Sequence, residues 1–258
     1  MKIKFLGTSA AWPLPRLGCQ CNICSSKDPK DRRTRTQLLI NDVLLLDAGI
    51  DTYQHLINSK VDPKKIKFVA VSHEHPDHTL GFQDLSRIYL PRKKGQIGSK
   101  SKIEVIIHQK TFSKIKNLFH FNEYKVLPVE IGQIVKVGGL DIQLLPVNHT
   151  DSSFGILVKE DNKKFFYAPD VKSLPKETFE KIKGVDIIAF DGSQLEIKLN
   201  NHQTILEGIE LGKILLAKRI YFLHIGHLTM PHKELESFVK DKGGKQFNIS
   251  YNGLIIDL

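Results

Sequence analysis

Four candidate metal ligands, His73, His75, Asp77 and His78, fall within six residues in the segment His73-Glu74-His75-Pro76-Asp77-His78. Two imidazoles placed two residues apart can bind one ion, and the adjacent Asp77 and His78 point towards a second. The segment directly follows the apolar run of residues 68–72, which is typical of a buried strand. This pattern favours a metal-binding loop over a chance cluster of solvated charges.

Four other apolar runs also end in a side chain that can bind a metal. Asp47 follows residues 43–46, His149 follows 144–148, Asp170 follows 165–169 and His224 follows 220–223. A buried imidazole or carboxylate is costly without a partner, so strands that end this way predict one polar cluster at a sheet edge. We expect His73, His75 and His149 to form one metal site, Asp77, His78 and His224 a second, and Asp170 to bridge them. Paired ions ~3.5–4 Å apart stabilise both the attacking and the leaving oxygen of a displacement.

All three cysteines lie in one short segment, Gly18-Cys19-Gln20-Cys21-Asn22-Ile23-Cys24. An odd number of cysteines crowded into one loop is not a disulfide framework, and a Cys19–Cys21 bridge would close a strained loop. Three thiolates at this spacing can instead bind one metal ion, with a fourth ligand from elsewhere in the chain. Buried free thiols are the alternative interpretation.

The elements that must position these residues alternate along the whole chain. We expect helices over residues 51–59, 79–90, 111–120, 175–183, 203–218 and 233–242, with His55 on an exposed helix face. We expect strands over 2–6, 37–40, 43–46, 66–72, 103–108, 125–130, 134–137, 140–147, 153–158, 163–168, 185–190, 219–224 and 254–258. Many strands with interspersed helices predict a layered α/β or α+β domain with two sheets flanked by helices. With no low-complexity linker in sight, one domain over residues 1–258 is the expected organisation.

Composition limits the class of protein without choosing a function. The chain has 258 residues, of which 41% are hydrophobic and 26% charged, which excludes disordered, collagen-like and coiled-coil classes. Apolar runs fall short of the ~18–20 residues that cross a bilayer, and Gly7 comes too early for a secretory leader, so we expect a soluble cytoplasmic protein without a membrane partner. The formal charge of +10 attracts anions such as nucleic acid or phosphorylated metabolites, but the lysines are scattered.

The order of these motifs resembles the metallo-β-lactamase superfamily, whose signature is a His-x-His-x-Asp-His loop after a strand. The resemblance runs from Asp47-Ala48-Gly49 through residues 73–78 to His149, Asp170 and His224, and so covers nearly the whole chain. It implies the α+β class, a four-layer αββα sandwich of two mixed sheets flanked by helices, with two metal ions at its edge. It also implies that Asp47 orients metal ligands.

The N-terminal segment is similar to a narrower group, the PhnP-type phosphoribosyl 1,2-cyclic phosphate phosphodiesterases. The similarity lies in Gly7-Thr8-Ser9, Pro13, Gly18 and the cysteine segment. It implies a structural zinc in the loop over residues 18–25, bound by Cys19, Cys21, Cys24 and His227. It further implies that His202 acts as a general acid, for which an imidazole suits near-neutral pH. Val171 and the segment 191–194 depart from the pattern of this group.

These features together predict a dinuclear metal phosphodiesterase that hydrolyses a small cyclic phosphodiester such as 5-phosphoribosyl 1,2-cyclic phosphate. Asp77 would orient the attacking water and His202 would protonate the leaving oxygen. The cofactors would be two divalent ions, Zn, Mn or Fe, and one structural Zn. Arg32, Arg33 and Arg35 are candidates for binding a terminal phosphate, because guanidinium binds phosphate through two hydrogen bonds.

Several alternatives stay open. An RNA-processing nuclease of the transfer-RNA 3′-end type shares the same metal loop, although only the basic stretch 91–102 corresponds to the RNA-clamping arm of those enzymes. Nucleic acid is therefore a partner that we do not favour. A non-hydrolytic relative in coenzyme biosynthesis, a purely structural zinc protein, and a thioester or lactone hydrolase are further alternatives. A homodimer is also an alternative, but no interface can be identified from the sequence.

Overall fold

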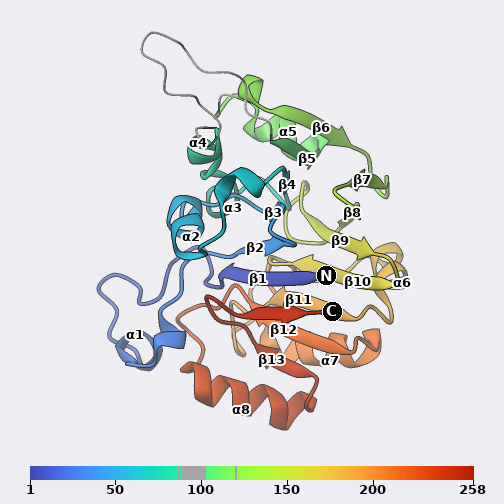
Figure 1. The fold of residues 1–258 in the computed structure, drawn as a ribbon. Helices are drawn as coiled ribbons and strands as arrows, with labels where there is room; N and C mark the ends of the chain where they lie inside the picture. Colours follow the sequence, from blue (N-terminus) through green and yellow to red (C-terminus); the bar gives the residue numbers. More distant parts are fainter. Residues whose placement is uncertain (87, 89–102, 120) are drawn as a thin grey trace.

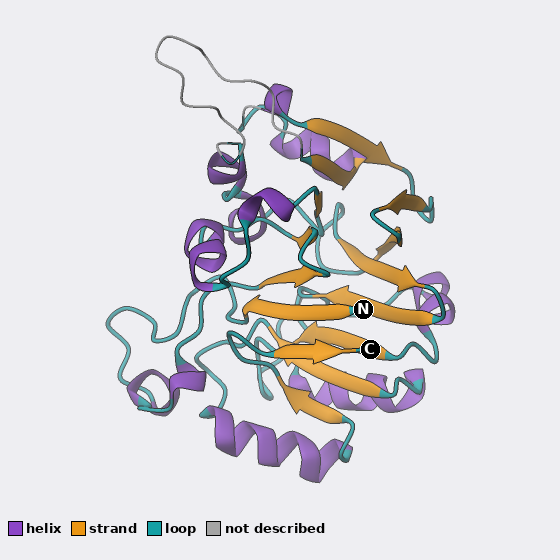
Figure 2. Cartoon of the chain, in the orientation of Figure 1, coloured by secondary structure: helices purple, strands orange, loops and turns teal. Residues whose placement is uncertain are grey.

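A computed structural model describes residues 1–86, 88, 103–119 and 121–258 of the chain. Two seven-stranded β-sheets pack face to face, and helices cover their outer faces (Figure 1). The same arrangement is visible when the chain is coloured by secondary structure, with helices at both outer sides of the strands (Figure 2). The predicted α+β class, with two mixed sheets flanked by helices, is confirmed.

The first sheet has the strand order β14-β1-β2-β3-β4-β5-β6. Its strands are β1 (Lys2–Gly7), β2 (Gln37–Ile40), β3 (Leu44–Leu46), β4 (Phe68–Ala70), β5 (Glu104–His108), β6 (Lys125–Val129) and β14 (Ile255–Asp257). Strands β3 to β6 run parallel to one another, whereas β14, β1, β2 and β3 alternate in direction.

The second sheet has the order β13-β12-β11-β10-β9-β8-β7. Its strands are β7 (Val135–Val137), β8 (Leu140–Pro146), β9 (Phe154–Glu160), β10 (Lys163–Ala168), β11 (Ile187–Asp191), β12 (Arg219–Leu223) and β13 (Phe247–Ile249). Strands β10 to β13 are parallel, and β7 to β10 are antiparallel. The carboxyl ends of parallel strands lie at the same edge of a sheet. The residues that follow them therefore occupy neighbouring positions, here after β3 and β4 in the first sheet and after β10, β11 and β12 in the second.

Helices pack on the outer face of each sheet through a core of their own. The first sheet is covered by α2 (Thr52–Asn58), α4 (Phe82–Leu85) and α5 (Gln109–Ile115). The second is covered by α6 (Lys176–Ile182), α7 (Ile205–Leu215) and α8 (His232–Gly243). Two short helices lie in loops, α1 (Asn22–Ser25) among the cysteines and α3 (Pro76–Thr79) in the histidine-rich segment.

A third apolar core fills the space between the sheets. Phe5 and Leu46 of the first sheet meet Ile142, Tyr167 and Leu223 of the second, and all five side chains are fully buried. Burying one such side chain contributes ~1.5–3 kcal/mol. The two sheets are therefore held firmly together, and the polar residues at their shared edge keep fixed relative positions.

The helix expected over residues 79–90 is interrupted, because two glycines bring the chain close to the turn after β3. A Cβ at Gly81 would lie 2.3 Å from the carbonyl oxygen of Gly49, and one at Gly49 would lie 1.9 Å from that of Asp77. The observed helices are α3 and α4, and residues 87, 89 and 90 of the expected helix lie outside the described residues. The close approach holds the 73–78 segment against the first sheet.

The other expected elements form, most with ends within three residues of those expected, and β13 is an addition that the sequence analysis missed. The helix expected over 111–120 is shorter: α5 ends at Ile115, and residue 120 lies outside the described residues. The stretch 91–102, the candidate RNA-clamping arm, lies outside the described residues. In the part of the chain that the structure describes, none of the helices has the length and apolar character needed to span a bilayer.

Candidate metal centre

Asp47 holds the histidine-rich segment in place through hydrogen bonds. It follows β3 in a left-handed conformation with φ of 64°, and its carboxylate is fully buried. Its two oxygens accept hydrogen bonds from Ser72 N at 2.7 Å, Ser72 Oγ at 2.9 Å and Tyr167 Oη at 2.8 Å. A fourth bond comes from His78 Nδ1 at 2.7 Å. With Nδ1 as the donor, the lone pair of His78 Nε2 is directed into the site.

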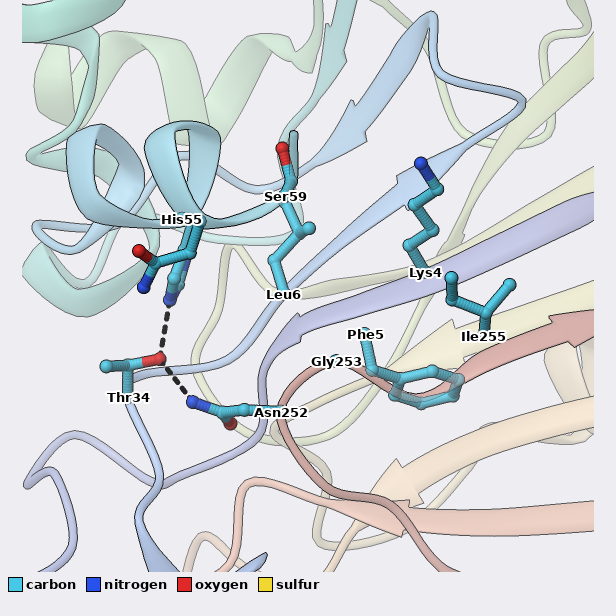
Figure 3. Close-up of a pocket in the computed structure, with 10 residues that line it drawn as sticks. Lys4, Phe5, Leu6, Thr34, His55, Ser59, Asn252, Gly253 and Ile255 are labelled. Atoms are coloured by element: carbon cyan, nitrogen blue, oxygen red, sulfur yellow. Dashed lines mark hydrogen bonds between the residues drawn. The ribbon is translucent and has the colours of Figure 1, made fainter. Parts of the chain in front are cut away.

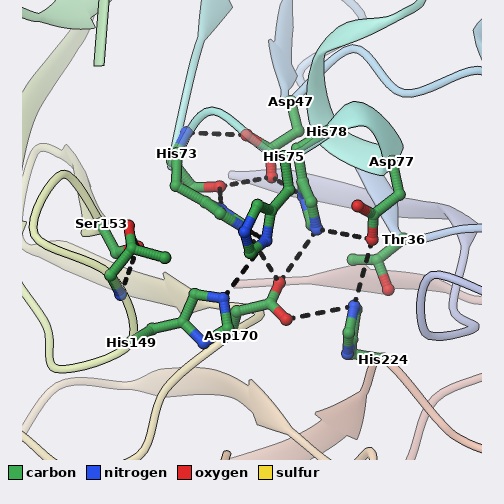
Figure 4. A network of polar contacts seen from close by, with 12 residues as sticks. Thr36, Asp47, His73, His75, Asp77, His78, His149, Ser153, Asp170 and His224 are labelled. Atoms are coloured by element: carbon green, nitrogen blue, oxygen red, sulfur yellow. Dashed lines mark hydrogen bonds and ion pairs between the residues drawn. The ribbon is translucent and has the colours of Figure 1, made fainter. Parts of the chain in front are cut away.

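Three imidazoles meet at one point of the site (Figure 4). His73 Nε2 lies 3.0 Å from His75 Nδ1, and His149 Nε2 lies 3.4 Å from the same atom. Outside this cluster, His73 Nδ1 faces the hydroxyl of Ser72 at 3.0 Å, and His149 Nδ1 donates to the carbonyl of Asn201 at 2.8 Å. Both outer nitrogens therefore carry the proton, which leaves the inner lone pairs free for a cation.

A second group of donors lies beside the first. Asp77 Oδ2 is 3.2 Å from His78 Nε2 and 3.5 Å from His224 Nε2. Asp170 lies between the two groups: its Oδ2 is 2.9 Å from His78 and 3.8 Å from His73, and its Oδ1 is 3.3 Å from His224. The structure thus brings together all seven residues expected to form the dinuclear site, from both sheets.

The chemistry of this pocket fits cations. His78 Nε2, His224 Nε2 and Asp170 Oδ2 are all buried, and none has a hydrogen-bond partner, although they lie within 2.9–3.5 Å of polar atoms. Lone pairs that face each other without a proton between them are unfavourable unless a positive ion sits among them. Imidazole and carboxylate suit Zn²⁺, Mn²⁺ and Fe²⁺.

Electrostatics keep the carboxylates of the pocket ionised. Burial alone would raise the pKa of Asp170, but the surrounding imidazoles of His224, His78 and His73 hold it well below its ordinary value. The same balance lowers the pKa of Asp77, next to His78 and His224. Two carboxylates are therefore charged at neutral pH, that of Asp170 buried and that of Asp77 partly exposed.

His202 lies at the side of the pocket and is held there by Asp191. Its Nδ1 is 2.6 Å from Asp191 Oδ2, and its ring stacks on that of His224 with centroids 5.8 Å apart. Burial disfavours the imidazolium, but the hydrogen bond and the charge of Asp191 outweigh it and raise the pKa of His202 to about 9. The sequence analysis did not identify Asp191 as a site residue, although it ends β11 in the way that Asp170 and His224 follow their strands.

The sequence analysis also did not identify Glu74 as a residue that supports the site. Its carboxylate points away from the metal pocket and accepts from Ser152 Oγ at 2.6 Å and from Lys114 Nζ at 2.8 Å. Thr150 Oγ1 lies 3.3 Å from the same carboxylate. Since Thr150 and Ser152 follow His149, Glu74 ties the loop of His149 to the segment that carries His73 and His75.

The cysteine loop meets His227 at a separate place. Cys19 Sγ lies 3.5 Å and Cys21 Sγ 4.0 Å from His227 Nδ1, and Cys24 completes a group whose four ligand atoms lie within 4.8 Å of one another. Residues 206 and 208 positions apart in the chain thus converge, because the segment after β12 pairs with Ser9. A closed set of three sulfurs and one nitrogen fits a tetrahedral structural zinc.

The three arginines proposed to bind a substrate phosphate make contacts within the protein. The prediction is wrong for Arg33, whose side chain is 1% exposed and donates to Thr8 Oγ1 and the carbonyl of Ser250. Arg35 is paired with Asp51 at 3.2 Å, and Arg32 donates to a backbone carbonyl in the cysteine loop. Their guanidinium groups hold loops in place, which sequence spacing alone does not reveal.

His55 is likewise buried rather than exposed, because it closes one wall of a cavity of about 360 Å³ beside α2 (Figure 3). Its Nδ1 donates to Gln37 Oε1 and its Nε2 accepts from Thr34 Oγ1, each at 2.6 Å. Asn252 Nδ2 donates to the same threonine oxygen. The polar wall of this cavity is thus satisfied internally.

The comparison with protein families decides the family. A model described as a beta-lactamase superfamily domain matches residues 43–225, which include every histidine and aspartate of the candidate metal centre. The chain belongs to the β-lactamase superfamily. Its metallo-enzymes are metal-dependent hydrolases, so this membership implies divalent metal ions at the pocket described above.

Curated relatives within the superfamily have different names. The chain is 26% identical over 249 residues to an octanoyltransferase from Porphyromonas gingivalis, a match that covers 91% of this chain and 48% of that protein. It is 23% identical over 313 residues to ribonuclease Z from Methanococcus aeolicus, covering 93% and 91% of the two chains. It is 24% identical over 227 residues to coenzyme PQQ synthesis protein B from Methylobacterium radiotolerans, covering 76% and 74%. The chain spans about half the length of the first curated relatives it matches.

Solved structures agree with the family. A new diphosphatase from the PhnP family superposes with a TM-score of 0.84 at 25% identity, covering 99% of this chain and 96% of the other. Zinc-bound PqqB from Methylobacterium extorquens (TM-score 0.82, 19% identity, full coverage of both chains) shares the fold. Human tRNase Z, short form (TM-score 0.72, 17% identity, covering 100% and 99%), shares it as well. The expected resemblance to the superfamily and to the PhnP group is confirmed.

Proposed function

We propose that the protein is a dinuclear metal phosphodiesterase that hydrolyses a small cyclic phosphodiester, such as 5-phosphoribosyl 1,2-cyclic phosphate. The observation that carries the proposal is the position of Asp170 between two sets of three donors, with buried lone pairs directed into one pocket. When bound, two divalent ions would polarise the phosphate and neutralise charge that develops on its oxygens. We assign one ion to His73, His75 and His149, the other to Asp77, His78 and His224, and Asp170 to both.

The residues around the pocket divide the work of proton transfer. Asp77 accepts a hydrogen bond from the attacking water and so orients it towards phosphorus. His202 donates a proton from Nε2 to the leaving alkoxide, because its Nδ1 proton is directed to Asp191. Asp191 stabilises the imidazolium that supplies this proton and fixes the ring beside His224.

The group of Cys19, Cys21, Cys24 and His227 is assigned a structural zinc. Its role would be to tie the loop of residues 18–25 to the segment that follows His224. It offers no open coordination position, since four protein ligands complete a tetrahedron. Hydrolysis is therefore assigned to the other pocket.

The phosphate preference is supported by the PhnP-family structure that matches nearly the whole chain at 25% identity. RNA processing is the second candidate, supported by the net charge of +10 and by the match to ribonuclease Z along 91% of that protein. In that case RNA affinity would fall steeply with salt, because binding releases counterions from the phosphates.

The test uses the purified protein loaded with Mn²⁺ or Zn²⁺ and a panel of phosphodiesters. The panel contains an aryl phosphodiester, 5-phosphoribosyl 1,2-cyclic phosphate, 2′,3′-cyclic nucleotides and a transfer-RNA precursor. We expect cleavage of the cyclic compounds and loss of that cleavage in His75→Ala. A metal-loaded enzyme that cleaves none of them, or a His75→Ala variant that behaves like the parent, would contradict the proposal.

A further inference from the structure

Trp12 is the only tryptophan in the chain, and its side chain is 64% exposed. Tryptophan is among the most buried side chains on average, and this chain has three apolar cores in which an indole could pack. An indole left mostly in water therefore needs an explanation other than folding.

Hydrogen bonds shape the turn that carries Trp12 and attach it to the segment after His224. Ser9 Oγ donates to the carbonyl oxygen of Trp12 at 2.7 Å. Ala10 N donates at 3.1 Å to the carbonyl of Ile225, the residue directly after His224. The turn of residues 9–12 thus lies against the segment that supplies one of the candidate metal ligands.

A second contact starts from the same turn. Thr36 Oγ1 donates to the carbonyl of Ser9 at 2.9 Å. Figure 4 draws Thr36 together with Asp77 and His224. The turn that leads to Trp12 is therefore fixed at both Thr36 and Ile225, the residue after His224.

Arg16 lies over the indole and is itself held by the cysteine loop. Its guanidinium carbon is 5.7 Å from the centroid of the Trp12 ring. Its Nη1 is 2.9 Å from His227 Nε2, and its backbone N–H donates to Cys24 Sγ at 3.3 Å. An exposed aromatic ring and a positive charge are therefore fixed side by side, on the loop that follows the turn attached to Ile225.

We propose that Trp12 and Arg16 form a subsite for the planar base of a nucleotide-type phosphodiester, whose phosphate reacts at the metal centre. This inference rests on the proposed function and narrows its substrate class to phosphodiesters that carry a base, which 5-phosphoribosyl 1,2-cyclic phosphate does not. An indole stacks on any nucleobase, and a guanidinium adds attraction to a π-system and to nearby phosphate. An aliphatic substituent would gain from neither the stacking nor the charge.

The first experiment compares two substrates that differ only in the base. Adenosine 2′,3′-cyclic phosphate is set against methyl riboside 2′,3′-cyclic phosphate, and kcat/KM is measured for each. The parent enzyme should favour the adenosine compound roughly five- to a hundredfold, the range that stacking supplies, and Trp12→Ala should remove most of this preference. Leu17→Ala is the matched control, because Leu17 lies on the same loop and is 98% exposed. It should leave both values unchanged.

The second experiment does not depend on turnover. Because the protein has one tryptophan, its fluorescence reports on this position alone. Adenosine 5′-monophosphate, with excitation at wavelengths where adenine does not absorb, should quench it saturably, and ribose 5-phosphate should not. Arg16→Gln should weaken the quenching.

The outcomes separate the two proposals. Absence of hydrolysis together with saturable quenching by the nucleotide would remove the phosphodiesterase proposal and keep the base subsite. Equal kcat/KM for both substrates, or fluorescence that the nucleotide does not alter, overturns the base subsite. Quenching by oligonucleotides alone, with steep salt dependence, would also overturn it and favour an RNA surface.

Discussion

The two candidate metal sites differ in how the protein holds their ligands. At the dinuclear pocket, donors follow strands of both sheets. The outer nitrogens of His73, His78 and His149 each have a second partner, which is Ser72, Asp47 and Asn201 respectively. At the cysteine loop, Cys19, Cys21 and Cys24 come from six residues that run into the short helix α1, and only His227 comes from elsewhere. Orientation by surrounding hydrogen bonds suits a reactive site, whereas a loop closed by its own ligands suits a structural ion.

The largest effect expected from this difference concerns Asp170. Asp170→Asn removes one negative charge shared by both donor sets, so kcat should fall by about 1,000-fold, beyond the ~10–100-fold loss typical of residues that only orient ligands. Metal analysis should show fewer ions in the pocket and an intact zinc at the cysteines. Asp161→Asn, in the turn between β9 and β10, is the control and should keep full activity.

Asp191→Asn should have the next largest effect. The carboxylate that holds His202 is lost while every candidate ligand stays, so kcat should fall about 100-fold with unchanged metal content. His202→Gln should cost as much, and the double variant no more than either single one. Additive losses in the double variant would show that the two residues do not act as a pair.

At the cysteine loop the expected effect is on stability instead of rate. Cys21→Ser should release one zinc per chain and destabilise the protein by about 3 kcal/mol, which lowers Tm by about 6–12 °C. Below the new Tm, the folded protein should still hydrolyse methyl riboside 2′,3′-cyclic phosphate, a substrate without a nucleobase. If activity disappears while the protein stays folded with its other metals bound, the distinction between a reactive and a structural site is wrong.

Glu74→Gln should produce a smaller change within the dinuclear pocket. The carboxylate bonds to Ser152 and Lys114 hold the loop of His149, so their weakening should reduce metal affinity at the site of His73, His75 and His149 by about 10-fold. Competition with a chelator measures this loss. The cysteine zinc should be unaffected, and equal weakening at all sites would contradict the assigned role.

The smallest effect concerns His232, a buried histidine outside both sites. Burial and the charges of Arg33 and Lys30 lower its pKa to about 4. Its neutral form therefore contributes stability that is complete above pH 6.5 and is lost as pH falls through about 4. Between pH 7 and 5.5 the parent should lose about 1 kcal/mol more than His232→Gln in urea unfolding. Equal pH dependence of the two proteins would show that His232 does not contribute to the loss of stability at low pH.

The sequence could predict the metal pocket because its residues follow apolar strands, and strand order brings such ends together. It could not predict that Asp191 holds His202, since an aspartate at a strand end has many uses and only the fold places it 2.6 Å from that ring. It misplaced Arg33 and His55 because burial of a charged or polar side chain depends on partners distant in the chain, such as Ser250 for Arg33 and Thr34 for His55. The helix expected over 203–218 likewise ends early, at Leu215, because Leu216 adopts a left-handed conformation and is 66% exposed.

The central claim is that two neighbouring cations share Asp170 in a pocket built from both sheets. Anomalous diffraction from crystals of the protein soaked in MnCl₂ tests it most directly. The account predicts two manganese peaks ~3.5–4 Å apart, one next to His73, His75 and His149 and one next to Asp77, His78 and His224. A single peak, or peaks confined to the cysteine loop with these histidines bound only to one another, would contradict it.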